Sequence, residues 1–191
     1  MSTLPRPSLT PEQYLRIERA ASFRSEFFDG EMFAMAGARQ AHNRLVANLI
    51  AGLHRHFRSR PCDVYPSDMR VCVNATGLYT YPDVVAVCGE QVFLDDEKDT
   101  LLNPGLLIEV LSPSTEAYDR GRKFEQYQSI ESLREYLLVA SDRAHVDLYS
   151  RQGDGRWLLT SVEGRDSVLT LESVGVQFTL ADLYEKVDFT N

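Results

Sequence analysis

Residues 105–127 read GLLIEVLSPSTEAYDRGRKFEQY, a buried strand followed by a polar turn and a helix. The strand has apolar side chains on both faces, which is typical of a sheet covered on both sides; they are Leu106, Leu107, Ile108, Val110 and Leu111. Glu109 interrupts this run. An ionised carboxylate in such a core is costly unless something compensates its charge. Glu109 is therefore paired with a cationic side chain, protonated, or bound to a metal ion.

Length and composition indicate one globular domain. The chain has 191 residues, of which 43% are hydrophobic and 25% charged, as in ordinary globular proteins. No apolar run approaches the ~20 residues that cross a bilayer, so we expect no membrane span. Residues 1–13 contain no apolar stretch typical of a signal peptide, so we expect a cytoplasmic protein.

The cysteines give no sign of a covalent framework. Cys62, Cys72 and Cys88 are odd in number, well separated, and form no C-x-x-C pair. This spacing favours neither a set of disulfides nor a zinc site. We interpret all three as small core residues in a reducing compartment.

The charge is acidic and unevenly distributed. A net charge of −8 argues against a protein that coats nucleic acid by bulk attraction. Residues 1–60 carry nine Lys or Arg against five Asp or Glu, whereas residues 61–120 carry three against eleven. Solvated faces of opposite sign would also produce this distribution.

The order of elements predicts a mixed sheet flanked by helices. Thr10-Pro11-Glu12-Gln13 is typical of a helix start and predicts a helix to about residue 21. Asp29-Gly30 predicts a hairpin turn. The apolar spacing over residues 39–58 predicts an amphipathic helix. Strands are expected over residues 62–66, 69–74, 79–88, 105–111, 134–140, 145–151, 156–164 and 168–171, and helices over 118–130 and 180–187. Strand, helix and strand between 105 and 140 imply a parallel βαβ unit. The class is α/β or α+β.

Two acidic residues in buried strands point to a metal. Asp83 follows Pro82 at the head of the run VVAV, and Glu109 lies within the next long strand. Neighbouring strands would bring these carboxylates together, where like charges repel unless a cation lies between them. Mg²⁺ prefers one or two carboxylates together with water and phosphate oxygens. The pair therefore suits a phosphodiesterase.

Lys123 is the candidate for a catalytic amine. It borders the apolar stripe of the predicted helix 118–130, so its ammonium could reach toward Glu109 and orient or deprotonate a water. Purely structural roles fit the same residues. Glu109 could pair with Arg120 or Arg70, Asp83 could cap its strand, and Lys123 could be an exposed lysine paired with Asp119.

The residues Pro82-Asp83 and IEVLSPSTEAYDRGRKFEQYQSIESLREYLLV, beginning at residue 108, resemble the PD-(D/E)XK phosphodiesterase superfamily. More specifically, the chain is similar to the Uma family of restriction-endonuclease-like proteins from FFDGEMFAMAGA to GVQFTLADLYEKV. The superfamily places its lysine two residues after the acid, where this chain has Leu111. As in the Uma family, Lys123 is then the residue that could supply the amine.

This resemblance implies one restriction-endonuclease-like domain over residues 1–191. It implies that Asp83 and Glu109 are metal ligands, Lys123 the catalytic lysine, Glu31 an additional acidic residue and His42 an accessory one. From the residues alone, Glu31 fits equally well as a surface strand residue. A lone histidine at the start of an apolar helix face, such as His42, is more often a core or capping group.

We therefore expect a Mg²⁺-dependent endonuclease that cuts DNA phosphodiesters, with Mn²⁺ as a possible substitute. A homodimer is expected by analogy, because duplex cleavage needs two sites. The alternative is a catalytically silent module that binds nucleic acid or protein on a nuclease-like fold. The acidic composition slightly favours this alternative.

Overall fold

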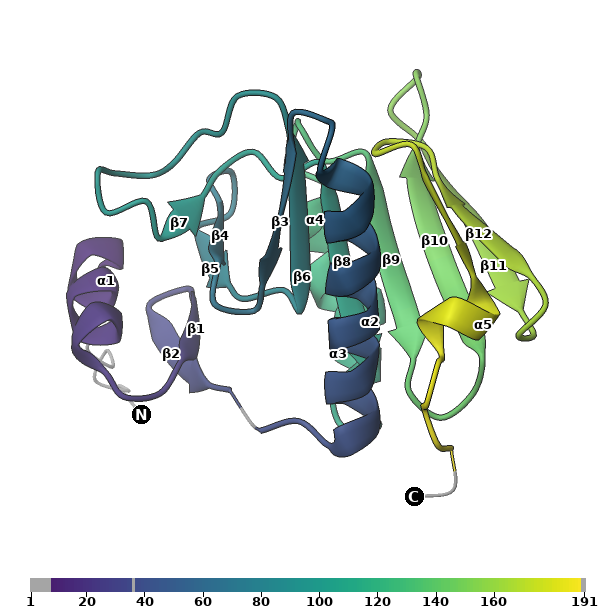
Figure 1. Cartoon of the computed structure of the whole chain (residues 1–191). Coiled ribbons are helices and arrows are strands. Elements are labelled where there is room, and N and C mark those ends of the chain that lie inside the picture. The colour runs from purple at the N-terminus through teal and green to yellow at the C-terminus, as the bar shows by residue number, and fades with distance from the viewer. Residues whose placement is uncertain (1–7, 36, 190–191) are drawn as a thin grey trace.

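A computed structural model describes residues 8–35 and 37–189 of the chain. Its helical segments are α1 (Pro11–Ala20), α2 (Gln40–Phe57), α3 (Glu116–Tyr118), a π-helical turn η1 (Asp119–Lys123), α4 (Phe124–Tyr127) and α5 (Leu180–Leu183). Figure 1 shows α2 standing in front of the longest sheet, with the N-terminal segment to one side and the C-terminal strands to the other. The mixed α/β class predicted from the sequence is confirmed.

The longest sheet has six strands in the order β11-β10-β9-β8-β6-β3. They are β3 (Cys62–Pro66), β6 (Val84–Cys88), β8 (Leu106–Leu111), β9 (Glu135–Ala140), β10 (His145–Arg151) and β11 (Trp157–Glu163). Strands β8 and β9 are parallel, and every other neighbouring pair is antiparallel. The predicted parallel βαβ unit is therefore confirmed, with the segment α3-η1-α4 as its crossover.

Alternate residues of β8 face two different cores, which explains its unbroken apolar sequence. Leu106, Ile108 and Val110 pack in the cluster that contains the apolar face of α2. Leu107 and Leu111 pack in the cluster that contains α4. Glu109 shares their side of the strand, so its carboxylate lies on the α4 side of the sheet.

A second sheet has five strands in the order β2-β1-β5-β4-β7. They are β1 (Ser25–Phe28), β2 (Glu31–Ala34), β4 (Arg70–Val73), β5 (Leu78–Thr80) and β7 (Thr100–Leu101). The predicted hairpin forms at Asp29-Gly30, where both residues have positive φ, and α1 begins with the predicted capping box of Thr10 and Gln13.

The predicted strand 79–88 is divided between the two sheets. Its first part is β5 and its last part is β6, with Tyr81, Pro82 and Asp83 between them. Proline lacks the N–H that a central strand must donate, so pairing ends before it and resumes after Asp83. The single central sheet expected from the sequence is in this way two sheets, with Asp83 at their junction.

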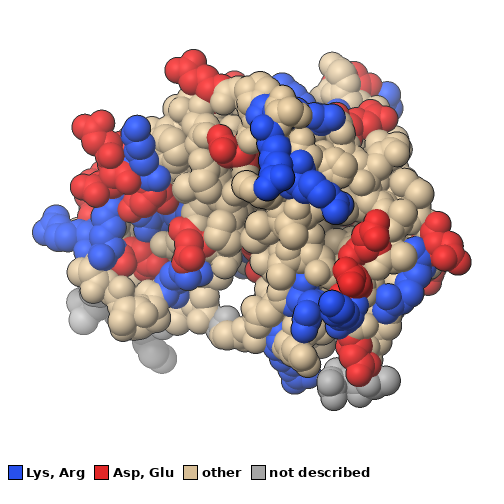
Figure 2. Space-filling model, viewed as in Figure 1, with Lys and Arg blue, Asp and Glu red and all other residues tan. Residues whose placement is uncertain are grey.

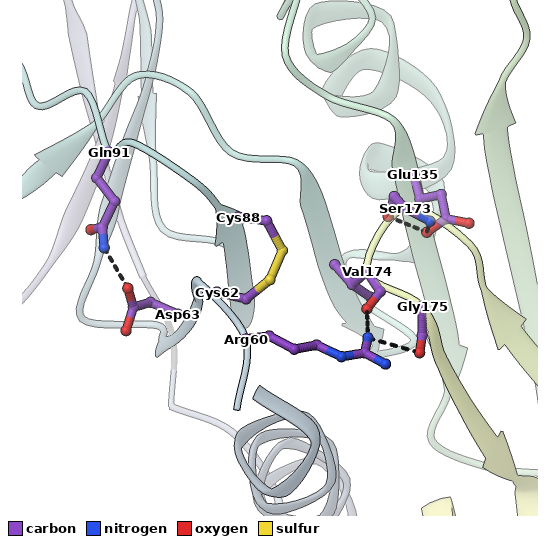
Figure 3. The surroundings of a disulfide bond; sticks show 9 residues. All are labelled: Arg60, Cys62, Asp63, Cys88, Gln91, Glu135, Ser173, Val174 and Gly175. Atoms are coloured by element: carbon purple, nitrogen blue, oxygen red, sulfur yellow. Dashed lines mark hydrogen bonds between the residues drawn. A yellow bond between two sulfur atoms is a disulfide. The ribbon is translucent and has the colours of Figure 1, made fainter. Parts of the chain in front are cut away.

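The interpretation of the cysteines was wrong for two of the three. Cys62 of β3 and Cys88 of β6 lie opposite each other and form a disulfide, shown in Figure 3. Only Cys72 is a free, buried cysteine. The sequence gives the spacing of the cysteines but not which strands become neighbours, and that pairing creates the bond.

The C-terminal region also differs in part from expectation. Strand β12 (Val168–Leu171) pairs with β13 (Val176–Thr179), which was not predicted, and α5 ends at Leu183 rather than near residue 187. The expected helix 118–130 is a continuous helical run over residues 116–127, made of α3, the π-helical turn η1 and α4, and residues 128–130 are not helical. Among the described residues, no helix is both long and apolar enough to span a membrane.

Candidate active site

One large cleft lies where the two sheets, α2 and the crossover segment meet. Its volume is about 1320 Å³, and its lining includes Asp83, Glu109, Lys123 and His42. Figure 2 shows the surface hollowed between the part that carries β1 and β2 and the part that carries α2. The structure thus brings four of the five residues predicted from the sequence into one cleft. Glu31 is exposed on β2 and is absent from the described lining.

Asp83 is fixed at the junction between the sheets. The antiparallel register pairs Val84 with Ile108, so Asp83 comes opposite Glu109, as the sequence suggested. Its Oδ2 accepts a hydrogen bond from the backbone N–H of Val110 at 2.8 Å and lies 3.0 Å from Nε2 of His42. Since His42 stands in the first turn of α2, this contact connects the helix to the end of the sheet.

Glu109 is compensated by a lysine and a tyrosine. Its Oε1 lies 2.8 Å from Nζ of Lys123 and accepts a hydrogen bond of 3.0 Å from the hydroxyl of Tyr127. The two arginines considered as partners bind elsewhere. Arg120 pairs with Glu116 and Asp147, and Arg70 pairs with Asp99. Of the three states expected for Glu109, the structure shows pairing with a cationic side chain, and that side chain is Lys123.

Lys123 is buried rather than exposed. Its side chain is only 6% exposed and lies 3.2 Å from Oε1 of Glu26 and 3.7 Å from Oδ1 of Asp119, in addition to Glu109. It ends the π-helical turn, a rare conformation often found at functional sites. The hydroxyl of Tyr136 holds this turn by donating to the carbonyl of Asp119 at 3.1 Å.

The charges of this cluster are strongly coupled. Burial raises the pKa of Glu109 well above its usual value, while the ammonium of Lys123 opposes the rise and the charges of Asp119 and Asp83 add to it. Burial alone would disfavour the Lys123 ammonium, but the charges around it, of which Glu109 is the largest, hold its pKa well above the usual range. Lys123 is therefore protonated near neutral pH, as a hydrogen-bond donor and not a base.

Glu26 is the acidic residue that sequence reasoning missed. It lies on β1, where its Oε1 contacts Lys123 and accepts a hydrogen bond from the hydroxyl of Thr80. The signal in the sequence is slight, an acidic residue within the short run SEFF; the structure buries Ser25 and Phe27 on the opposite face of this strand. Its position near Lys123, almost a hundred residues later, depends on how the two sheets pack.

The carboxylates of Asp83 and Glu109 are the candidates for holding a metal. Each commits one oxygen, Oδ2 of Asp83 and Oε1 of Glu109, to the contacts given above. Their other oxygens form no hydrogen bond within residues 8–35 and 37–189. The same described residues contain no group of three or more His, Cys, Asp or Glu arranged to hold an ion. A hydrated Mg²⁺, which needs only one or two carboxylates, fits this donor set; a cage made wholly of protein ligands does not.

The chain is similar over most of its length to a known protein family and to two curated proteins. A family model described as "Putative restriction endonuclease", Uma2, matches residues 11–182. The chain is 37% identical over 187 residues to the uncharacterized protein slr1290 of Synechocystis, covering 97% of this chain and 96% of that protein. It is 38% identical over 159 residues to the uncharacterized protein sll1609 of the same organism, covering 83% and 90%.

A solved structure shares the fold. The crystal structure of "a putative nuclease belonging to DUF820" from Anabaena variabilis superposes with a TM-score of 0.76. The match covers 92% of this chain and 97% of that one at 15% identity. At this identity the likeness shows the fold alone.

Proposed function

The chain belongs to the Uma2 family of restriction-endonuclease-like proteins, and from this we propose that it is a metal-dependent endonuclease that hydrolyses DNA phosphodiester bonds. The observation that carries the proposal is the buried Lys123–Glu109 pair in the cleft, with Asp83 opposite Glu109 across neighbouring strands. A buried ammonium with several carboxylates around it is costly to assemble, so its place in an open cleft favours a chemical role.

Asp83 and Glu109 would hold Mg²⁺, or Mn²⁺ in its place, through the oxygens that their protein contacts leave free. When bound, the ion would neutralise phosphate charge and lower the pKa of water. His42 and the Val110 amide keep Asp83 oriented, and Tyr127 does the same for Glu109. These contacts limit the motion of both carboxylates before substrate arrives.

Lys123 would act through its positive charge. Because its pKa is raised, its ammonium donates hydrogen bonds to an attacking water or to a phosphate oxygen and does not remove a proton. Proton removal from the attacking water would then fall to a group other than Lys123 and the two carboxylates assigned to the metal. We include a homodimer in the proposal, by analogy with other small nucleases, which are often symmetric dimers.

The test is incubation of the purified protein with Mg²⁺ or Mn²⁺ and two substrates, a supercoiled plasmid and a single-stranded circular DNA. The wild type should cut at least one of them. Asp83→Asn and Glu109→Gln should lower the rate about 100-fold or more, as loss of a preorganised charged group does. Asp154→Asn, in an exposed turn paired with Arg156, is the matched control and should keep full activity. Equal cutting by all variants, or no cutting by any, contradicts the proposal.

A second candidate is a binding module that no longer cuts. Two observations favour it. Glu109 already forms an ion pair with Lys123, and the described residues contain no group of three side chains that could hold a metal ion. Calorimetric titration with Mn²⁺ separates the two functions. A nuclease should bind Mn²⁺ in a way that Glu109→Gln weakens, whereas a silent module should show no such dependence.

A further inference from the structure

The cleft exposes several large apolar side chains, most of them aromatic. Of nine exposed large hydrophobic residues in the described chain, four line it: Phe23, Phe33, Met35 and Tyr118, with exposed fractions of 63%, 49%, 36% and 36%. Three of the four are aromatic. A concentration of exposed apolar residues in one depression marks a binding surface.

Two of these rings flank the charged cluster. Phe33 of β2 is the cross-strand partner of Glu26 in β1, and partners in an antiparallel pair project to the same side of the sheet. Since Glu26 contacts Lys123, the Phe33 ring lies on the side of the hairpin that faces the cluster. Tyr118 of α3 lies near the same cluster, with its ring centroid 5.9 Å from the Lys123 ammonium.

The opposite side of the cleft carries cations without carboxylate partners. Arg39 and Arg44 lie at the N-terminal end of α2, and the structure gives neither an ion pair within the described residues. Figure 1 shows this end of α2 across from the β1–β2 hairpin. The helix begins with no side-chain cap and no acidic residue in its first turn, so its N-terminal N–H groups add to the positive potential there.

We propose that this cleft binds a single-stranded polynucleotide, with bases stacked on Phe23, Phe33 and Tyr118 and phosphates held by Arg39 and Arg44. Aromatic platforms beside a basic strip are the usual arrangement for unpaired nucleic acid. The inference deepens the proposed nuclease function by naming the form of its substrate, and it rests on that function for the chemistry but not for the binding.

A duplex fits the same features poorly. Within a duplex the faces of the bases are stacked on each other, so exposed rings could meet only edges or phosphates. Duplex binders commonly neutralise about 6–10 phosphates over a broad basic surface. This chain has a net charge of −8, and at the cleft only Arg39 and Arg44 are proposed to hold phosphates, both without an ion pair within residues 8–35 and 37–189. The volume of about 1320 Å³ also exceeds that of small-molecule sites, about 300–1,000 Å³, as expected for a polymer segment.

Binding is measured by fluorescence anisotropy with the Asp83→Asn protein in Mg²⁺ buffer, so that cleavage does not interfere. The probes are a 12-nucleotide DNA strand, the same sequence as RNA, and the DNA strand annealed to its complement. At least one single strand should bind at least tenfold more tightly than the duplex. Comparison of the DNA strand with the RNA strand shows whether the cleft prefers deoxyribose or ribose. Duplex binding that equals or exceeds both single strands overturns the proposal.

Ring deletions test the stacking directly. Phe33→Ala and Phe23→Ala should each weaken single-strand binding about 5- to 100-fold, the range for loss of one base–aromatic stack. Leu158→Ala is the matched control, because Leu158 is 54% exposed on β11 and lies outside the cleft lining. The double variant Arg39→Gln/Arg44→Gln should bind more weakly. Its plot of log binding constant against log salt concentration should also be shallower, by a slope of roughly 0.7 per lost phosphate contact. Phe variants that bind as well as the Leu158 control contradict the assignment.

The outcomes separate this inference from the proposed function. Tight, ring-dependent binding of single strands without cleavage by the wild type would reject the nuclease and retain the binding site. Cleavage that depends on Asp83, together with binding indifferent to Phe23 and Phe33, would retain the nuclease and reject the single-strand site.

Discussion

Replacing Lys123 with methionine removes the ammonium from the cluster while keeping a similar aliphatic length. Glu109 and Lys123 have side chains that are each 6% exposed, so the variant leaves a carboxylate in the core without its cation. Breaking a buried ion pair on one side costs about 3–5 kcal/mol. That is a large fraction of the ~5–15 kcal/mol by which ordinary domains are stable. Lys123→Met should therefore lower the free energy of unfolding by about 3–5 kcal/mol near neutral pH.

The cost should depend on pH with a definite sign. The Lys123 charge is the largest effect that lowers the pKa of Glu109. Without it, burial keeps this pKa above its ordinary value of 4.5. The folded variant then binds more protons than the unfolded chain, and its stability falls as pH rises. The loss relative to wild type should be smallest below about pH 4.5 and should grow as pH rises through the raised pKa of Glu109.

Urea denaturation followed by circular dichroism at several pH values measures this effect. The double variant Lys123→Met/Glu109→Gln removes both charges and should recover more than half of the loss, because a neutral pair leaves no uncompensated carboxylate at this position. Lys186→Met is the control: its side chain is 72% exposed, so the change should stay within about 0.5 kcal/mol. A loss below about 1 kcal/mol for Lys123→Met, or no recovery in the double variant, would refute the reasoning.

Two further predictions concern the fold. The Cys62–Cys88 disulfide joins residues 26 positions apart and so restricts the unfolded chain. Its reduction should lower the free energy of unfolding by about 3–4 kcal/mol. Urea denaturation with and without reductant measures this loss. An unchanged midpoint would mean that the bond does not constrain the chain. Gly52→Ala should destabilise by about 1–2 kcal/mol despite the better helix propensity of alanine, because a Cβ there meets the Phe178 ring. Thermal melting should show partial rescue by Phe178→Leu, and a raised melting temperature for Gly52→Ala alone would contradict the packing argument.

Local patterns determined most of the elements and pointed to four of the residues that line the candidate site. The capping box at Thr10, the turn at Asp29-Gly30 and the apolar spacing of α2 involve residues within a few positions of one another, so sequence alone specifies them. The anomaly of Glu109 in an apolar strand is equally local. It led to Asp83 because successive buried strands often pair, and the structure makes β6 and β8 neighbours.

Only the tertiary structure decided which distant groups meet. Glu26 reaches Lys123, and Cys62 reaches Cys88, because particular strands lie side by side, and no spacing in the sequence encodes that choice. The burial of Lys123 has the same origin, since two sheets and a π-helical turn enclose it, where the sequence predicted a regular helix with Lys123 at the border of its apolar stripe. Periodicity records which face of an element is buried, whereas the partner against that face follows from the packing of the whole chain.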